Sequence, residues 1–185
     1  MNARVVFLCG PVQSGKTTLA KRLVQEGWIA QLNPLEIYVN RVGKMPDSWS
    51  ADDQLRFVQF MADEWTMDAI RTMHEMRRPV VVERCVIDSL VWTKDYYPHR
   101  YREAMNVARR VVDVLNSDEV RVVLLEPVKR VYERKPVRRF EDVVRQASHY
   151  FMFREVMSEL GVRYRELSAV DVDRRVKEVI NLCKM

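Results

Sequence analysis

The sequence predicts an α/β fold of three α/β/α layers, in which helices cover both faces of a five-stranded parallel sheet. Apolar segments alternate with amphipathic segments along all 185 residues. Two of the apolar segments, 79–82 and 120–125, are almost continuous, which is typical of parallel strands buried on both faces. A glycine-rich phosphate-loop pattern joins the first apolar segment to the first amphipathic one. The length suits a single domain, 1–185, with a sizeable core.

The individual elements follow from residue type and periodicity. The expected strands are 4–9, 28–32, 79–85, 120–127 and 162–167. The expected helices are 16–26, 50–76, 99–115, 128–134, 141–160 and 171–182. Ser50, with Asp53 three residues later, is typical of a helix N-terminus, and Gly161 of a helix C-terminus. Asn33-Pro34 is expected to end the second strand in a loop.

The charge balance predicts a partner that carries phosphate. The net charge of +5 fits nucleotides or nucleic acid. The arginines, however, come as scattered pairs, such as Arg174-Arg175, which are typical of solvated helix faces rather than of a basic channel. We therefore expect nucleotides as partners and not nucleic acid.

The cysteines and the apolar segments limit which metal sites and which cellular location we expect. Cys9, Cys85 and Cys183 show no metal-type spacing. The first two fall in predicted strands, where small buried hydrophobic residues are expected. No apolar run is long enough to cross a bilayer, and the N-terminal segment leads straight into the phosphate loop rather than resembling a signal peptide. The expected location is the cytoplasm, with no membrane contact.

The phosphate-loop pattern runs from Gly10 through 11–14 to Gly15, Lys16 and Thr17. A strand before it and a helix after it complete the P-loop context. Its glycines let backbone N–H groups approach phosphates, and the helix N-terminus adds partial positive charge. Lys16 is expected to reach the terminal phosphates, and Thr17 to ligate Mg²⁺. The predicted ATP-binding residues are Gly10, Gln13, Ser14, Gly15, Lys16, Thr17 and Thr18.

Other P-loop classes fit less well. No Asp-x-x-Gly or Asn-Lys-x-Asp segment of the GTPase type is evident, and large ATPases usually exceed this length. Glu83-Arg84 ends a buried strand that we expect to lie beside the phosphate-loop strand, at the edge where open α/β sheets bind ligands. An Arg-rich segment at about 130–142 follows the fourth strand. A small kinase with an Arg-rich lid is the class that these features favour.

In the order of its elements, nearly the whole chain resembles the thymidylate kinase and deoxynucleoside kinase superfamily. Thymidylate kinases carry a helix reading roughly Phe-x-Ala-(Asp/Asn)-Arg before a strand ending Asp-Arg-Tyr, and this chain has 60–64 "FMADE" and 83–85 "ERC". Deoxynucleoside kinases end that strand in Glu-Arg-Ser and place a base-reading glutamine at a spacing close to that of Gln59 and Glu83. The resemblance implies a P-loop kinase fold that uses ATP and Mg²⁺, and a homodimer is common among its members.

The chain also departs from both families. Glu64 stands where thymidylate kinases aim an arginine at the base, and Cys85 fits neither motif. Asp88 replaces a serine, and Leu90 an arginine. The substrate of either family therefore does not carry over directly.

Roles follow from phosphoryl transfer, which needs positioning and charge neutralisation. Glu83 would hold Mg²⁺ with Thr17 or assist the acceptor, and Arg84 would bind the acceptor's phosphate or its 5′ oxygen; the alternative is a structural ion pair at the strand end. Because 11–14 "PVQS" offers no arginine, the lid is the expected source of positive charge. Its candidates are Arg134 and Arg138, then Arg130 and Arg139, and the alternative is a solvated helix.

The acceptor pocket is expected to involve Glu36, Gln59, Phe60 and Asp63 together with Arg84. Glu36 lies where deoxynucleoside kinases place their general base, with Asp88 as a rival. The amide of Gln59 can pair with a base edge, and the ring of Phe60 can stack on it.

The expected activity is an ATP-dependent transfer of the γ-phosphoryl group to a (deoxy)nucleoside 5′-monophosphate, as in thymidylate kinases. A deoxynucleoside kinase is the alternative within the same superfamily. A nucleotide-binding P-loop module and a kinase of nucleic-acid ends are the alternatives from other classes.

Overall fold

A computed structural model of the protein describes residues 4–127, 140–168 and 171–184. Its five strands form one sheet in the order β2-β3-β1-β4-β5, and all neighbours are parallel. The strands are β1 Val5–Cys9, β2 Ile29–Gln31, β3 Val80–Glu83, β4 Val120–Leu125 and β5 Tyr164–Leu167. The predicted three-layer fold with a five-stranded parallel sheet is confirmed.

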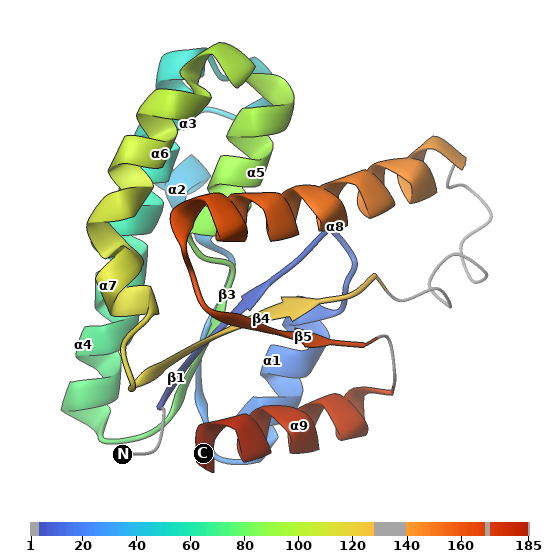
Figure 1. Ribbon diagram of the computed structural model, residues 1–185. Helices are drawn as coiled ribbons and strands as arrows, with labels where there is room; N and C mark the ends of the chain where they lie inside the picture. Colours follow the sequence, from blue (N-terminus) through green and yellow to red (C-terminus); the bar gives the residue numbers. More distant parts are fainter. Residues whose placement is uncertain (1–3, 128–139, 169–170, 185) are drawn as a thin grey trace.

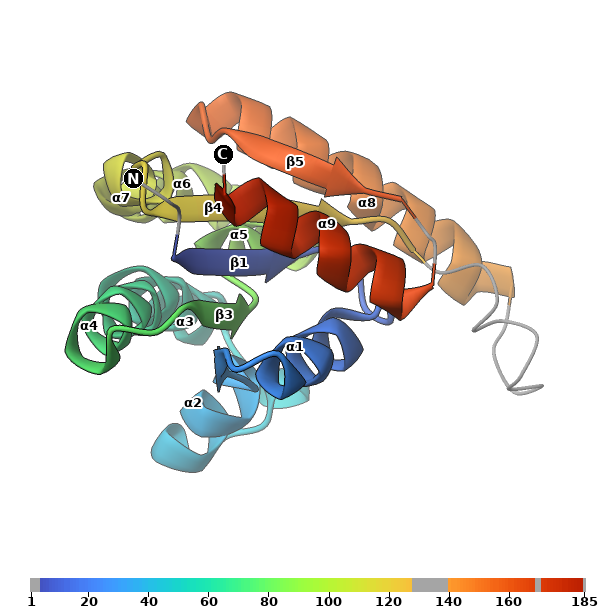
Figure 2. The ribbon, with the colours of Figure 1, turned by 90° about the horizontal axis from the view of Figure 1, so that it is seen from below.

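Helices cover both faces of the sheet (Figure 1). They are α1 Lys16–Gln25, α2 Pro34–Val42, α3 Ala51–Phe60, α4 Thr66–Met76, α5 Val86–Tyr96, α6 Tyr101–Ala108, α7 Val112–Leu115, α8 Phe140–Leu160 and α9 Val172–Lys184. Figure 2 views the sheet from the side that α1 and α9 cover, with α5 and α8 behind it. None of the helices in the described parts of the chain is long and apolar enough to cross a membrane.

The two faces of β1 belong to two separate hydrophobic clusters. Phe7 packs into the larger one, with side chains of α3 to α8, whereas Leu8 packs into the smaller one, with α1 and α9. Every residue of β1 is fully buried, which explains its continuous apolar sequence. Because β1 pairs with β3 through Leu8 and Glu83, the phosphate loop and the end of β3 lie side by side, as expected.

The long helix predicted for 50–76 is present but contains a π-helical turn, Met61–Trp65, between α3 and α4. The Thr66 hydroxyl donates a hydrogen bond to the Met61 carbonyl at 2.8 Å inside this turn. Turns of this kind are frequent near functional sites because they re-aim side chains. Here Trp65 is directed at the strand end that carries Arg84, and its indole N–H donates to the Arg84 carbonyl at 3.3 Å.

The structure contains two helices that the sequence did not predict. In α2, Pro34 occupies the first helical turn, where its fixed φ favours helix and its missing N–H costs nothing. The segment is therefore not a loop. In α5, the first six residues are all buried, and five of them are apolar or small, so no amphipathic period marks the helix. The predicted helix 99–115 is interrupted by a 3₁₀ turn, and the helix predicted at 128–134 falls outside the described residues.

Candidate active site

The phosphate loop joins β1 to α1 through backbone conformations that require glycine. Gly10 has φ 140°, and a Cβ on it would lie 2.7 Å from the Leu125 carbonyl oxygen. Gly15 has φ 90°, and Gln13 also adopts a positive φ, of 67°. Side chains rarely tolerate such conformations, so the glycine spacing reflects the shape of the loop. Thr18 is exposed in the first turn of α1.

Lys16 lies beneath this loop and is only 4% exposed. Its ammonium group donates to the carbonyls of Gly10 at 2.6 Å and Pro11 at 2.7 Å, and to the Ser14 hydroxyl at 3.3 Å. Burial, aided by the positive charge of Arg84, lowers the pKa of Lys16 to about 7. An anion such as phosphate, bound beside this ammonium group, would stabilise its charged form.

Thr17 and Glu83 meet across the gap between the loop and the end of β3. The Thr17 hydroxyl donates to Glu83 Oε1 at 2.6 Å, and the Asn33 N–H donates to Oε2 at 3.4 Å. Glu83 is 6% exposed. A hydroxyl and a carboxylate are the hard oxygen ligands that Mg²⁺ prefers. This pair, 66 residues apart in sequence, therefore suits a metal ion beside the phosphates.

Arg84 turns the chain from β3 into α5 with a positive φ of 68°. Its N–H donates to the Leu8 carbonyl at 2.9 Å, and its carbonyl accepts the bond from Trp65 described above. Its guanidinium contacts the buried carboxylate of Asp88 at 3.4 Å. A non-glycine residue in this region is strained, and the surrounding bonds hold Arg84 next to the phosphate loop.

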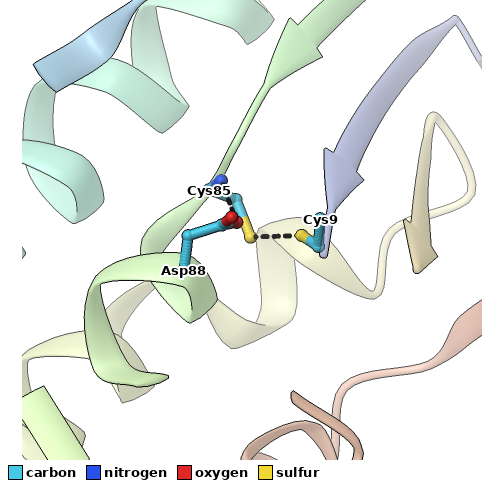
Figure 3. Close-up of side chains that lie close together, drawn as sticks. All are labelled: Cys9, Cys85 and Asp88. Atoms are coloured by element: carbon cyan, nitrogen blue, oxygen red, sulfur yellow. Dashed lines mark hydrogen bonds between the residues drawn. The ribbon is translucent and has the colours of Figure 1, made fainter. Parts of the chain in front are cut away.

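Asp88, Cys85 and Cys9 form a closely packed buried cluster (Figure 3). The two sulfur atoms lie 3.2 Å apart, and Asp88 Oδ2 accepts the Cys85 N–H at 3.1 Å as the capping box of α5. Burial raises the pKa of both Cys9 and Asp88. The three residues could geometrically hold a metal, but their bonds to one another and to the start of α5 already give them a structural role. Both cysteines are fully buried.

A cavity of about 420 Å³ extends from Arg84 and Asp88 between α2, α3 and α5. Aromatic and apolar side chains dominate its wall, and the polar ones are few. Its lining residues are Leu35, Pro46, Asp47, Trp49, Gln54, Phe57, Met61, Arg84, Asp88, Ser89, Trp92, Tyr96 and Tyr97. An apolar cavity with a few convergent polar groups is the usual form of a small-molecule site.

The four residues predicted for the acceptor pocket besides Arg84 do not line this cavity. Gln59 is exposed on α3, and Glu36 is exposed in the first turn of α2. Asp63 forms an exposed ion pair with Arg110 at 2.8 Å. Phe60 is buried, with its ring 5.2 Å from that of Tyr38.

On α3, the residues that line the cavity are instead Gln54 and Phe57. The Gln54 amide donates to the Ser89 carbonyl at 3.1 Å and to the Thr93 hydroxyl at 3.0 Å. The signal that was missed is a glutamine at helical spacing from Phe57 and Met61, within the apolar face of the predicted helix. The lid arginines Arg130, Arg134, Arg138 and Arg139 lie outside the described residues.

The fold and the phosphate loop together define a P-loop protein of the nucleoside triphosphatase and kinase superfamily. More particularly, the chain belongs to the AAA domain family AAA_28, whose model matches residues 5–175. These findings support a P-loop nucleoside triphosphatase and kinase superfamily, which is broader than the thymidylate kinase and deoxynucleoside kinase group that the sequence resembles, and they do not support thymidylate kinases in particular.

Solved structures with the same fold include NadR protein in complex with NR, with a TM-score of 0.72 and 17% identity over 99% of this chain and 52% of that chain. A second NadR structure, in complex with NAD and AMP-PNP, gives 0.71 and 17% over 99% and 50%. YorR protein from Bacillus subtilis, in complex with phosphorylated GDP, gives 0.56 and 20% over 97% and 95%. This chain thus spans about half the length of the NadR chains. Curated protein sequences give no match.

Proposed function

We propose that the protein is an ATP- and Mg²⁺-dependent kinase that transfers the γ-phosphoryl group of ATP to a small nucleoside-type acceptor bound in the cavity. The observation that carries this proposal is the single segment from Glu83 to Asp88. Its first residue bonds to Thr17 of the phosphate loop, and Arg84 and Asp88 line the cavity. One short segment therefore serves both a phosphate donor and an acceptor.

The donor half of the reaction follows from the loop. Backbone N–H groups and Lys16 would bind the phosphates, and Lys16 would neutralise charge that develops on the transferred group. Thr17 and Glu83 would hold Mg²⁺, which supplies further neutralisation of the phosphate oxygens. Arg134 and Arg138 remain the predicted lid residues that complete this neutralisation.

The first candidate acceptor is a (deoxy)nucleoside 5′-monophosphate, as in thymidylate kinases. The guanidinium of Arg84 would bind its phosphate at the inner end of the cavity. The base would stack among the aromatic rings of the wall. The bound phosphorylated GDP of YorR, which has the same fold, is consistent with a phosphorylated ligand.

The second candidate acceptor is a nucleoside without a phosphate, and the charges in the cavity favour it. Among the described lining residues, Asp47 and Asp88 carry carboxylates and Arg84 alone carries a guanidinium. That guanidinium already contacts Asp88. Asp88 would then accept a hydrogen bond from the acceptor hydroxyl and take its proton during transfer. NadR, which also has this fold, was crystallised with NR.

A coupled assay of ADP release across nucleosides, nucleoside monophosphates and NR tests the proposal. We expect one group of acceptors to stimulate ADP release, and Lys16→Ala to abolish it without unfolding the protein. Direct measurement of ATP binding should accompany the assay. ATP binding without acceptor-stimulated release would favour a P-loop binding module, and stimulation by oligonucleotide ends alone would favour a nucleic-acid-end kinase.

A further inference from the structure

Arg175 in α9 is a buried arginine whose hydrogen bonds join three segments around the phosphate loop. Its guanidinium donates to the Ser14 carbonyl at 2.5 Å and to the Glu126 carbonyl at 3.0 Å, and its Nε donates to the Ser168 carbonyl at 3.2 Å. The side chain thereby links the loop to the ends of β4 and β5. The residue is 2% exposed, which is unusual for arginine.

The burial of this charge needs a physical reason. Desolvation lowers the pKa of Arg175, while the charges of Glu126 and Glu178 oppose that shift; arginine nevertheless stays protonated in proteins. A buried cation is costly unless it is fully hydrogen-bonded. An apolar residue of similar length would avoid that cost but would leave the carbonyl oxygens of Ser14, Glu126 and Ser168 without this donor. The charge is therefore placed where three segments beside the phosphate loop present acceptors.

The Ser14 carbonyl belongs to the same peptide group as the N–H of Gly15. Hydrogen bonds polarise the groups that they share, so a charged donor on the carbonyl makes the N–H a stronger donor. Amides of such a loop are the groups that bind phosphate. The residues 11–14 between the two loop glycines carry no cation of their own. Arg175 supplies positive charge from behind the loop, where it does not occupy the space of the phosphates.

We propose that Arg175 is a positioning residue that sets the conformation of the phosphate loop and increases its affinity for the phosphates of ATP. This goes beyond the proposed function, because it concerns ATP binding alone and holds for any acceptor. It also assigns α9 a role in the nucleotide site. The neighbouring α1 packs against α9 in the smaller hydrophobic cluster, where Leu19 and Leu23 meet Val176 and Val179, and this packing holds α9 beside the loop.

The chain offers a matched control in the adjacent residue. Arg174 has the same charge on the same helix, but its side chain is 66% exposed and bonds to Glu178 at 3.1 Å. Arg174→Gln and Arg175→Gln therefore make the same change in net charge, the first at an exposed position of α9 and the second at a buried one. Arg175→Lys keeps the charge and loses the planar fork, so it separates charge from hydrogen-bond geometry.

The test is calorimetric binding of ATP, and of inorganic tripolyphosphate as a probe without a base, to the four proteins. We expect Arg175→Gln to raise the Kd of both ligands by about 10- to 100-fold, the range for hydrogen bonds to charged groups. Arg175→Lys should recover at least part of this loss, and Arg174→Gln should stay within twofold. The acceptor KM, where turnover is measurable, should not change.

Three results would overturn the inference. In the first, folded Arg175→Gln binds ATP and tripolyphosphate as the unmodified protein does. In the second, Arg175→Lys is no better than Arg175→Gln, which would leave the charge without a role. In the third, acceptor affinity falls as much as ATP affinity, as expected for a general loss of structure. If Arg175→Gln does not fold, the Kd for ATP of Arg175→Lys is compared with that of the control Arg174→Lys. We expect the two values to agree within about 10-fold, because both variants keep the charge. A larger loss in Arg175→Lys would contradict the role of charge.

Discussion

Binding of ATP above neutral pH is expected to take up a proton, and Lys16 is the group that binds it. In the nucleotide-free protein, burial lowers the pKa of Lys16 to about 7. The triphosphate would place several negative charges beside its ammonium group, and opposite charge at this distance favours the protonated form. Binding of ATP should therefore change the protonation of this one buried lysine.

The size of the effect follows from that pKa. At pH 8, one unit above it, about nine-tenths of Lys16 is neutral in the free protein, so binding should take up about 0.9 proton. At pH 6 about nine-tenths is already charged, and the uptake should fall to about 0.1 proton. The uptake should therefore rise steeply with pH between these two values.

Calorimetric titration with MgATP in two buffers of different ionisation enthalpy measures this uptake, because the buffer supplies the proton. At pH 8 the γ-phosphate of MgATP is already deprotonated and adds nothing. Lys16→Arg, which is charged at all these pH values, should bind ATP without proton uptake. Lys21→Arg makes the same change at an exposed position of α1 and should leave the uptake intact. Equal heats in the two buffers at pH 8, or an unchanged uptake in Lys16→Arg, would show that Lys16 is not the group that takes up the proton.

The low pKa of Lys16 also predicts that the nucleotide-free protein becomes more stable as pH rises from 7 toward 10.5. In this range unfolded Lys16, with its ordinary pKa of 10.5, holds a proton that the folded residue lacks, and the free energy of unfolding should rise by an amount on the order of 5 kcal/mol. Urea unfolding should show this rise in the unmodified protein but not in Lys16→Met. Glu83→Gln keeps the shape of the side chain but removes its charge, so the Mg²⁺ concentration for half-maximal turnover should rise at least 10-fold; an unchanged Mg²⁺ dependence would mean that Glu83 does not serve the metal. Trp92→Ala opens the cavity wall where its ring stacks on Tyr96 at 5.4 Å and should raise the acceptor KM about 10-fold with the KM for ATP unchanged; equal rises in both constants would place the acceptor elsewhere.

The phosphate loop could be predicted from sequence because its parts are consecutive. Gly10, Gly15, Lys16 and Thr17 act through local backbone shape, which residue type fixes almost alone. The contact between Thr17 and the end of β3 could also be predicted, because parallel strands place their carboxyl ends at one edge of the sheet. Only its distance of 2.6 Å required the structure.

The lining of the cavity was less predictable, because it depends on which side of a helix faces inward. Gln59 and Gln54 are five residues apart on α3, which rotates their side chains by roughly 140° relative to each other. Gln54 lines the cavity, whereas Gln59 is exposed. A resemblance in spacing selected Gln59, whereas the packing of α3 against α5 turns Gln54 toward the cavity.

The layer order, the sheet type and the phosphate loop could be predicted from the amino-acid sequence, since apolar periodicity and glycine placement are local properties. The different contacts of the arginine pair 174–175 depend on how α9 packs in the folded protein. Both residues look alike in sequence, but they point about 100° apart on the helix. One reaches solvent and the other reaches the carbonyl of Ser14. That difference arises from the contact of α9 with segments more than a hundred residues away, which no local pattern records.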